Sequence, residues 1–168
     1  MRLATTFFAG AMCLCATAHA QDNDSPYVTF QVLKPELALR MAETAMSFCR
    51  DAGYQVGVTV VDRFGIPQVF LRDRFAGAHV YETSRRKAWT AVSFRGSTVE
   101  LDIATRPDGE SAGIRHLTEA LPLGGGNTVE NGDGSIVAGI GVSGAPSPKF
   151  DEDCALAGIS SIEDDIAF

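Results

Sequence analysis

The chain has 168 residues, of which 45% are hydrophobic and 21% charged, a composition typical of one globular domain rather than a disordered polymer. Its formal net charge is -7 at pH 7, so the basic surface that binds nucleic acid is not expected. Four cysteines are too few for a scaffold built on disulfides.

The first twenty residues have the pattern of a secretory signal peptide. Arg2 gives a positive start, residues 3–15 are mostly apolar, and Ala18, His19 and Ala20 form a small-residue cleavage signal before a polar stretch. The apolar run is shorter than the roughly 20 residues that a membrane span needs. We therefore expect residues 1–20 to be removed, leaving a periplasmic or secreted chain without a membrane span.

Two cysteines, Cys49 and Cys154, remain after this cleavage. In an oxidising compartment they are candidates for one disulfide. The loop it closes would have roughly a hundred residues, which corresponds to up to about 4 to 5 kcal/mol of stabilisation in the chain-entropy model. The alternative is a pair of buried thiols that pack as small hydrophobic groups.

An N-terminal arm of mixed character, residues 21–33, precedes a single predicted domain over residues 34–168. Apolar residues at spacings of three and four predict a helix that begins at Pro35 and ends at Gly53. Valine-rich runs on either side of an Asp-Arg-Phe-Gly turn predict a β-hairpin. In chain order, we expect strands over 56–61 and 67–71, helices over 81–94 and 99–104, a short turn or helix over 114–120, a strand near 128–129, a turn at 131–134, a strand over 136–142 and a helix over 151–159.

The segment from Gly139 to Gly144 matches the G-x-G-x-x-G pattern and follows a predicted strand, as a dinucleotide-binding loop would. Pro146 and Pro148, however, stand where the phosphate-binding helix should begin, and too little chain follows for the rest of such a domain. We interpret these glycines as positions where a helix packs closely on the strand.

Several blocks of the sequence, in the same order and with plausible spacing, resemble one family. They are VVDRFG (60–65), RKAWTA (86–91), LGGG (123–126), VAGIGVSG (137–144) and DEDCA (151–155). The family is the GlcG/HbpS-like one, also known as DUF336 or PduO C-terminal-like, and the resemblance covers about residues 34–160. It implies an α+β fold with a five-stranded antiparallel sheet flanked by helices, profilin- or roadblock-like. It also implies haem binding in some members and assembly into homo-oligomers.

Candidate site residues follow from the resemblance to haem-binding members. His79 and His116 are the available histidines of the mature chain and candidate axial ligands, and the alternative for each is a surface or capping histidine. Arg86 and Lys87 are candidates for pairing with the haem propionates, and Thr90 is carried over from the family's second helix. The sequence shows no metal-ligand spacing, and no H-E-x-x-H, C-x-x-C or G-x-S-x-G motif.

Three functions remain open at this point, in decreasing order of support. The first is an exported haem-binding protein, sensing haem or redox stress or sequestering haem. The second is a small enzyme or accessory protein of organic-acid or aromatic catabolism, in which arginines grip a small carboxylate ligand and Asp62 or His79 acts as acid or base. The third is an oligomeric assembly module without a ligand. The arginines in question are Arg63, Arg72, Arg74, Arg85, Arg86 and Arg95.

Overall fold

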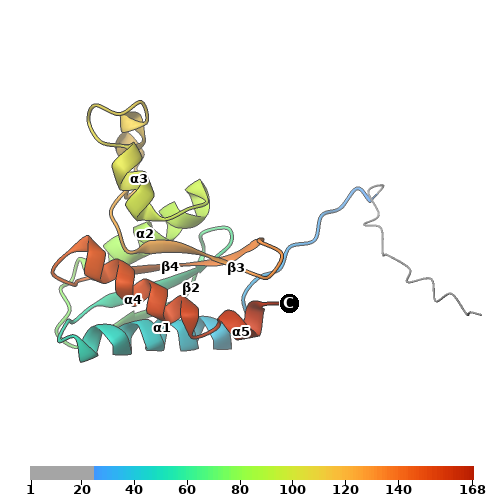
Figure 1. Cartoon of the computed structure of the whole chain (residues 1–168), viewed down its shortest axis with the longest axis horizontal. Coiled ribbons are helices and arrows are strands. Elements are labelled where there is room, and N and C mark those ends of the chain that lie inside the picture. Colours follow the sequence, from blue (N-terminus) through green and yellow to red (C-terminus); the bar gives the residue numbers. More distant parts are fainter. Residues whose placement is uncertain (1–24) are drawn as a thin grey trace, which may run out of the picture.

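The structure is a computed structural model that describes residues 25–168 (Figure 1). The expected signal peptide and the first four residues of the expected arm lie outside this part of the chain. The elements in chain order are α1 (Pro35–Asp51), β1 (Gly57–Asp62), β2 (Pro67–Arg72), α2 (Val80–Phe94), α3 (Thr98–Ala104), the 3₁₀-helix η1 (Ala112–His116), β3 (Gly126–Glu130), β4 (Ile136–Ser143), α4 (Pro148–Ser160) and α5 (Glu163–Ile166). The expected helices and strands are confirmed, and the short α5 is an addition.

The sheet of residues 25–168 has four strands in the order β2-β1-β4-β3, and every neighbouring pair is antiparallel. The α+β antiparallel class is therefore confirmed, whereas the expected fifth strand is wrong. The extended arm before α1 makes one backbone hydrogen bond to the sheet, from Leu33 N to Val137 O at 3.3 Å. A single bond near the start of β4 does not form a strand ladder.

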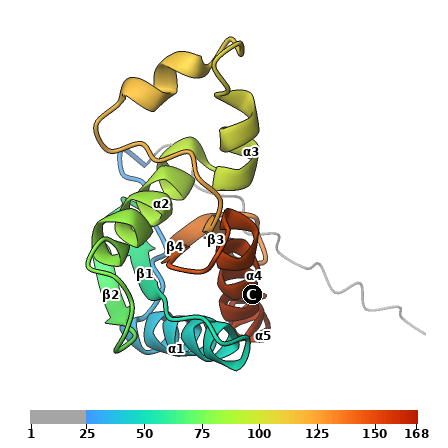
Figure 2. The ribbon, with the colours of Figure 1, turned by 90° about the vertical axis from the view of Figure 1, so that its left-hand side faces the viewer.

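Helices cover both faces of the sheet (Figures 1 and 2). Helices α1 and α4 pack side by side on one face, and their buried apolar side chains form the main core with β1 and β4. The disulfide between Cys49 and Cys154 joins these two helices within this core, with a Cα–Cα distance of 5.6 Å. The disulfide expected from the sequence is thus confirmed, rather than a pair of free buried thiols.

Helix α2 lies on the other face and approaches β4 through two glycines. A Cβ atom on Gly141 would lie 2.0 Å from the backbone oxygen of Ser84, and one on Gly139 would lie 2.5 Å from Val92. No side chain fits at either position, so the glycines set the distance between helix and strand. This confirms the packing interpretation of the glycine motif.

Between α2 and β3 the chain makes an excursion away from the sheet that includes α3 and η1 (Figure 2). Ser97 caps α3 by accepting a hydrogen bond from Val99 N at 3.0 Å. Arg115 ties η1 to α3 through the backbone oxygen of Thr105 at 2.7 Å. Among residues 25–168, no helix has both the length and the apolar character needed to cross a bilayer.

Candidate functional site

A cleft of about 250 Å³ lies where the start of α2 meets the loop between β4 and α4. Its polar side chains come from six residues, namely His79, Thr83, Lys87, Ser143, Ser147 and Asp151. Its apolar wall is formed by Leu123, Ala145, Pro146 and Pro148. The sequence builds this wall because β4 ends at Ser143, Gly144 turns the chain with φ +125, and Pro148 begins α4.

A buried ion pair forms one side of the cleft. Lys87 Nζ donates hydrogen bonds to Asp151 Oδ2 at 2.7 Å and to Val142 O at 2.9 Å, and its side chain is fully buried. Asp151 Oδ1 accepts a hydrogen bond from Ala145 N at 2.9 Å. Burial lowers the pKa of Lys87 and raises the pKa of Asp151, and each charge opposes the shift of the other. The pair therefore joins α2, α4 and the end of β4 through a desolvated contact.

The absence of a side chain at Gly125 leaves room for this ion pair. A Cβ atom on Gly125 would lie 2.7 Å from the Cβ of Asp151 and 3.1 Å from Lys87 Nζ. The residue has φ +110, a backbone conformation that suits glycine. The glycine block before β3 is therefore part of the wall around the ion pair.

His79 is exposed and lies at the N-cap of α2, at the edge of the cleft. Its imidazole lies against Gly77, where a Cβ atom would come within 2.7 Å of the ring atoms Nδ1 and Cε1. Thr83 Oγ1 contacts the backbone oxygen of His79 at 3.0 Å and Ser143 Oγ at 2.7 Å. The imidazole therefore lies between the loop before α2 and the cleft.

Arg86 and Thr90 lie elsewhere, where α2 contacts the segment before β3. Arg86 donates hydrogen bonds to the backbone oxygens of Glu119 at 3.2 Å and Ala120 at 2.8 Å. Thr90 is buried, and its Oγ1 accepts a hydrogen bond from Leu121 N at 2.8 Å. These two residues hold the end of the excursion against α2.

The structure therefore divides the five predicted site residues into three places. His79 and Lys87 line the cleft together, Arg86 and Thr90 bind the segment before β3, and His116 is exposed on η1 in the excursion. Their haem-binding roles stay predictions.

Asp151 and Ser143 are site residues that the sequence analysis did not assign. Asp151 lies in the DEDCA block. The helical spacing of Lys87 was a signal that a carboxylate such as Asp151 must lie opposite it. Lys87 follows Ser84 and precedes Ala91 at helical spacing, on the face of α2 that turns out buried. A lysine on a buried face requires a carboxylate partner, because a buried charge without one is strongly unfavourable.

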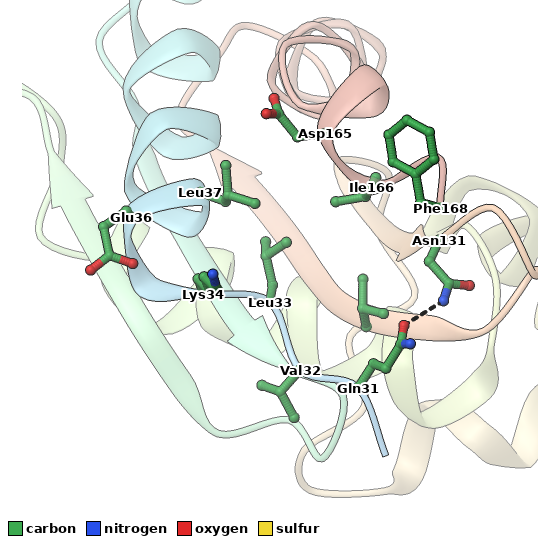
Figure 3. Close-up of a pocket in the computed structure, with 11 residues that line it drawn as sticks. Gln31, Val32, Leu33, Lys34, Glu36, Leu37, Asn131, Asp165, Ile166 and Phe168 are labelled. Carbon is green, nitrogen blue, oxygen red and sulfur yellow. Dashed lines mark hydrogen bonds between the residues drawn. The ribbon is translucent and has the colours of Figure 1, made fainter. Parts of the chain in front are cut away.

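Another cavity, of about 610 Å³, lies between the arm, the start of α1 and the C-terminus (Figure 3). Its wall contains Leu37, Ile166 and Phe168, and a hydrogen bond of 2.7 Å from Asn131 Nδ2 to Gln31 Oε1 joins two more of its lining residues. None of the five predicted site residues lines it. It also offers no histidine, cysteine or tyrosine for iron, so the cleft at α2 is the better candidate.

A four-stranded antiparallel sheet with helices on both faces, and a buried lysine–aspartate pair that joins a helix of each face, defines a small α+β domain. The chain belongs to the HbpS-like family: the family described as haem degrading protein HbpS-like matches residues 33–160. The resemblance stated from the sequence is thereby confirmed.

Solved structures support this assignment. A double mutant of HbpS from Streptomyces reticuli is 35% identical, with a TM-score of 0.77 over 88% of this chain and 98% of that one. The ORFY protein of Klebsiella pneumoniae, described as DUF336, is 26% identical, with a TM-score of 0.76 over 83% and 98%. A structure described as a PduOC:heme complex is 29% identical, with a TM-score of 0.74 over 78% and 95%.

Among curated proteins, the chain is similar to the corrinoid adenosyltransferase PduO of Salmonella typhimurium. The two are 28% identical over 149 residues, which cover 88% of this chain and 43% of that protein. A second PduO, from Citrobacter freundii, is 27% identical over 172 residues, or 51% of its length. The chain thus spans about half the length of the curated relatives it matches.

Proposed function

We propose that this chain is an exported haem-binding protein in which His79 is an axial ligand of the iron. The observation that carries the proposal is the exposed imidazole of His79, seated on Gly77 at the edge of the cleft. The similarity to a relative crystallised with haem, and the description of the family, support the same ligand. Export together with a haem site suits a role in sensing or sequestering haem outside the cytoplasm.

The residues of the cleft fit this group in their chemistry. Histidine is a common axial ligand of haem iron, and the wall of Leu123, Pro146 and Pro148 is apolar. The volume of about 250 Å³ is below the roughly 300 to 1,000 Å³ typical of enclosed small-molecule sites. The cleft would therefore enclose only part of this group, and a second copy of the chain or solvent would cover the rest. Bound haem would supply iron redox chemistry, and the chain would supply the ligand and the orientation.

Propionate pairing is a separate part of the proposal. Arg86 is half-buried and makes two hydrogen bonds to backbone oxygens, which leaves guanidinium N–H groups for a propionate. Lys87 is fully buried and already pairs with Asp151. We therefore assign the propionate role first to Arg86, and Lys87 would serve it only through its remaining N–H.

Haemin titration of the purified chain, followed by Soret absorbance, tests the proposal. We expect saturable binding near one haem per chain, loss of that binding in His79→Ala, and its retention in the matched exposed-histidine variant His116→Ala. Gly77→Ala should also weaken binding, because the new Cβ would displace the imidazole. Non-saturating absorbance in the wild type, or equal binding in both histidine variants, would refute the role of His79.

Export is tested on the same protein recovered from cell fractions. Mass spectrometry should find Gln21 as the first residue of protein from the periplasm or medium. An intact N-terminus on protein in the cytoplasm would contradict this part of the proposal. Light scattering of the recovered protein tests the expected homo-oligomer.

A further inference from the structure

A second polar pocket, of about 370 Å³, brings together two arginines that are far apart in sequence. Arg63 comes from the turn between β1 and β2, and Arg95 from the end of α2. The hairpin between β3 and β4 completes the pocket with Glu130, Ser135 and Ile136. No residue of the cleft at α2 lines this pocket, so the two sites are distinct.

Aromatic rings hold Arg63 in place. Its guanidinium carbon lies 4.2 Å from the ring centroid of Phe30 and 5.7 Å from that of Phe64. The two rings are themselves in edge contact, with centroids 5.4 Å apart. Contact with ring faces orients a guanidinium without using its N–H donors. Arg63 is therefore positioned and still able to donate hydrogen bonds.

Arg95 occupies a strained backbone position. It has φ 59, and among residues 25–168 it is the one non-glycine residue with positive φ. This position follows the last turn of α2, where glycine is the usual residue. A side chain kept at such a position is often connected with function. Here the side chain is an arginine that lines the pocket.

Neither arginine has a carboxylate or hydrogen-bonding partner among the described residues. Arg40, Arg50, Arg85 and Arg115 each pair with a carboxylate. Arg63 and Arg95, like Arg72, Arg74 and Arg106, form no ion pair and no side-chain hydrogen bond within residues 25–168, but only Arg63 and Arg95 line a common pocket. All these pairs form in a chain with a net charge of -7, which has more carboxylates than cations.

The acidic groups at and next to the pocket accept hydrogen bonds within the chain and pair with neither arginine. Glu130 accepts a hydrogen bond from Thr128 Oγ1 at 3.3 Å. Asp62, next to Arg63, accepts hydrogen bonds from Phe64 N at 2.8 Å and Ile66 N at 3.0 Å, so it stabilises the turn.

We propose that this pocket binds a small organic carboxylate that carries a hydrogen-bond donor at its other end. Two guanidinium groups match the planar carboxylate, which arginine binds with paired N–H donors. Glu130 gives the pocket one acceptor of opposite charge, which suits an amino or hydroxyl group on the ligand. This site is independent of the haem proposal.

Isothermal titration calorimetry with three probes tests the ligand chemistry. γ-Aminobutyrate has both groups, butyrate has the carboxylate alone, and butylamine has the donor alone. We expect γ-aminobutyrate to bind most tightly, butyrate more weakly, and butylamine not at all. Absence of saturable binding up to about 10 mM of any probe would overturn the proposal. Inorganic phosphate that binds as tightly as γ-aminobutyrate would also overturn it, because the pocket would then select charge rather than a carboxylate.

Substitutions of the pocket residues test whether the ligand binds in this pocket. Arg95→Gly removes the side chain at a backbone position that glycine accepts, so we expect a stable protein whose affinity falls about tenfold or more. Arg63→Ala should have a similar effect, and the exposed Arg72→Ala, outside the pocket, is the matched control. Glu130→Gln should abolish the preference for γ-aminobutyrate over butyrate. Equal affinities of Arg95→Gly and Arg72→Ala would refute the assignment.

Discussion

Replacement of Lys87 by methionine should strongly destabilise the fold, because it leaves the carboxylate of Asp151 buried without its counter-charge. Asp151 is 4% exposed, and after the substitution it keeps the hydrogen bond from Ala145 N. Removal of one partner from a buried ion pair costs about 3 to 5 kcal/mol. The remaining hydrogen bond places our expectation at the lower end, about 3 kcal/mol, which is a large part of the 5 to 15 kcal/mol typical of a domain.

Urea unfolding at neutral pH measures this loss. Arg85→Met is the control, since Arg85 pairs with the half-exposed Glu119 and such surface pairs contribute about 0 to 1 kcal/mol. The double variant Lys87→Met with Asp151→Asn should lose less than the sum of the single variants by about 1 kcal/mol or more. A loss below about 1 kcal/mol in Lys87→Met, or strict additivity, would refute the reasoning.

The pH dependence of the stability of Lys87→Met tests the same buried charge independently. Burial raises the pKa of Asp151 above its ordinary value of 3.8, and Lys87 opposes that rise. In Lys87→Met the pKa of Asp151 in the folded state is therefore raised further. The folded variant then takes up a proton before the unfolded chain does, so its stability relative to the wild type recovers as pH falls toward 3.8. A deficit that stays constant or grows over this range would contradict the assignment of the buried charge.

Two further substitutions test the packing and the surface of the domain. Gly141→Ala places a Cβ atom 2.0 Å from Ser84 O and should cost about 3 kcal/mol or prevent folding, whereas Gly113→Ala, with open space around it, should be nearly neutral in thermal unfolding. The hydrogen bonds from Arg50 lower the pKa of Asp73 below its ordinary value of 3.8. The stability that Asp73 contributes is therefore present above that value and is lost as pH falls through the lowered pKa. Asp73→Asn should flatten this acid loss in unfolding measured against pH, and an unchanged acid profile would show that the pair does not contribute.

The secondary structure was predictable because the local signals agree with one another. Pro35 begins α1 as expected, and the turn at 62–65 joins β1 and β2. The number of strands was not predictable from such signals. The extended segment that ends at Leu33 makes only one backbone hydrogen bond to the sheet among the described residues, and strand pairing depends on tertiary position rather than on local pattern. The fifth strand came from the family resemblance alone, and this is where the prediction failed.

The site was harder to predict, since consecutive helix residues point in different directions. Arg85, Arg86 and Lys87 look like one basic patch in the sequence, but a helix turns about 100° per residue. The structure accordingly gives the three side chains three different partners, namely Glu119 Oε2, backbone oxygens before β3, and Asp151. Helical spacing alone could have indicated that Lys87 faces inward. The choice of Asp151 among its acidic neighbours required the position of α4.

Four of the five blocks that carry the family resemblance meet at one point in space. Lys87 comes from RKAWTA, Gly125 from LGGG, Val142 from VAGIGVSG and Asp151 from DEDCA, and all four are in contact at the buried ion pair. The pair bridges 64 residues of sequence and requires its glycine wall. The motif residues therefore explain why the sequence identifies the fold so well and the ligand so poorly. Under the two proposals, the residues that select a ligand lie away from this buried contact, with His79 at the rim of the cleft and Arg63 and Arg95 in a separate pocket. Ligand specificity can thus change while the four residues that meet at the buried ion pair stay the same.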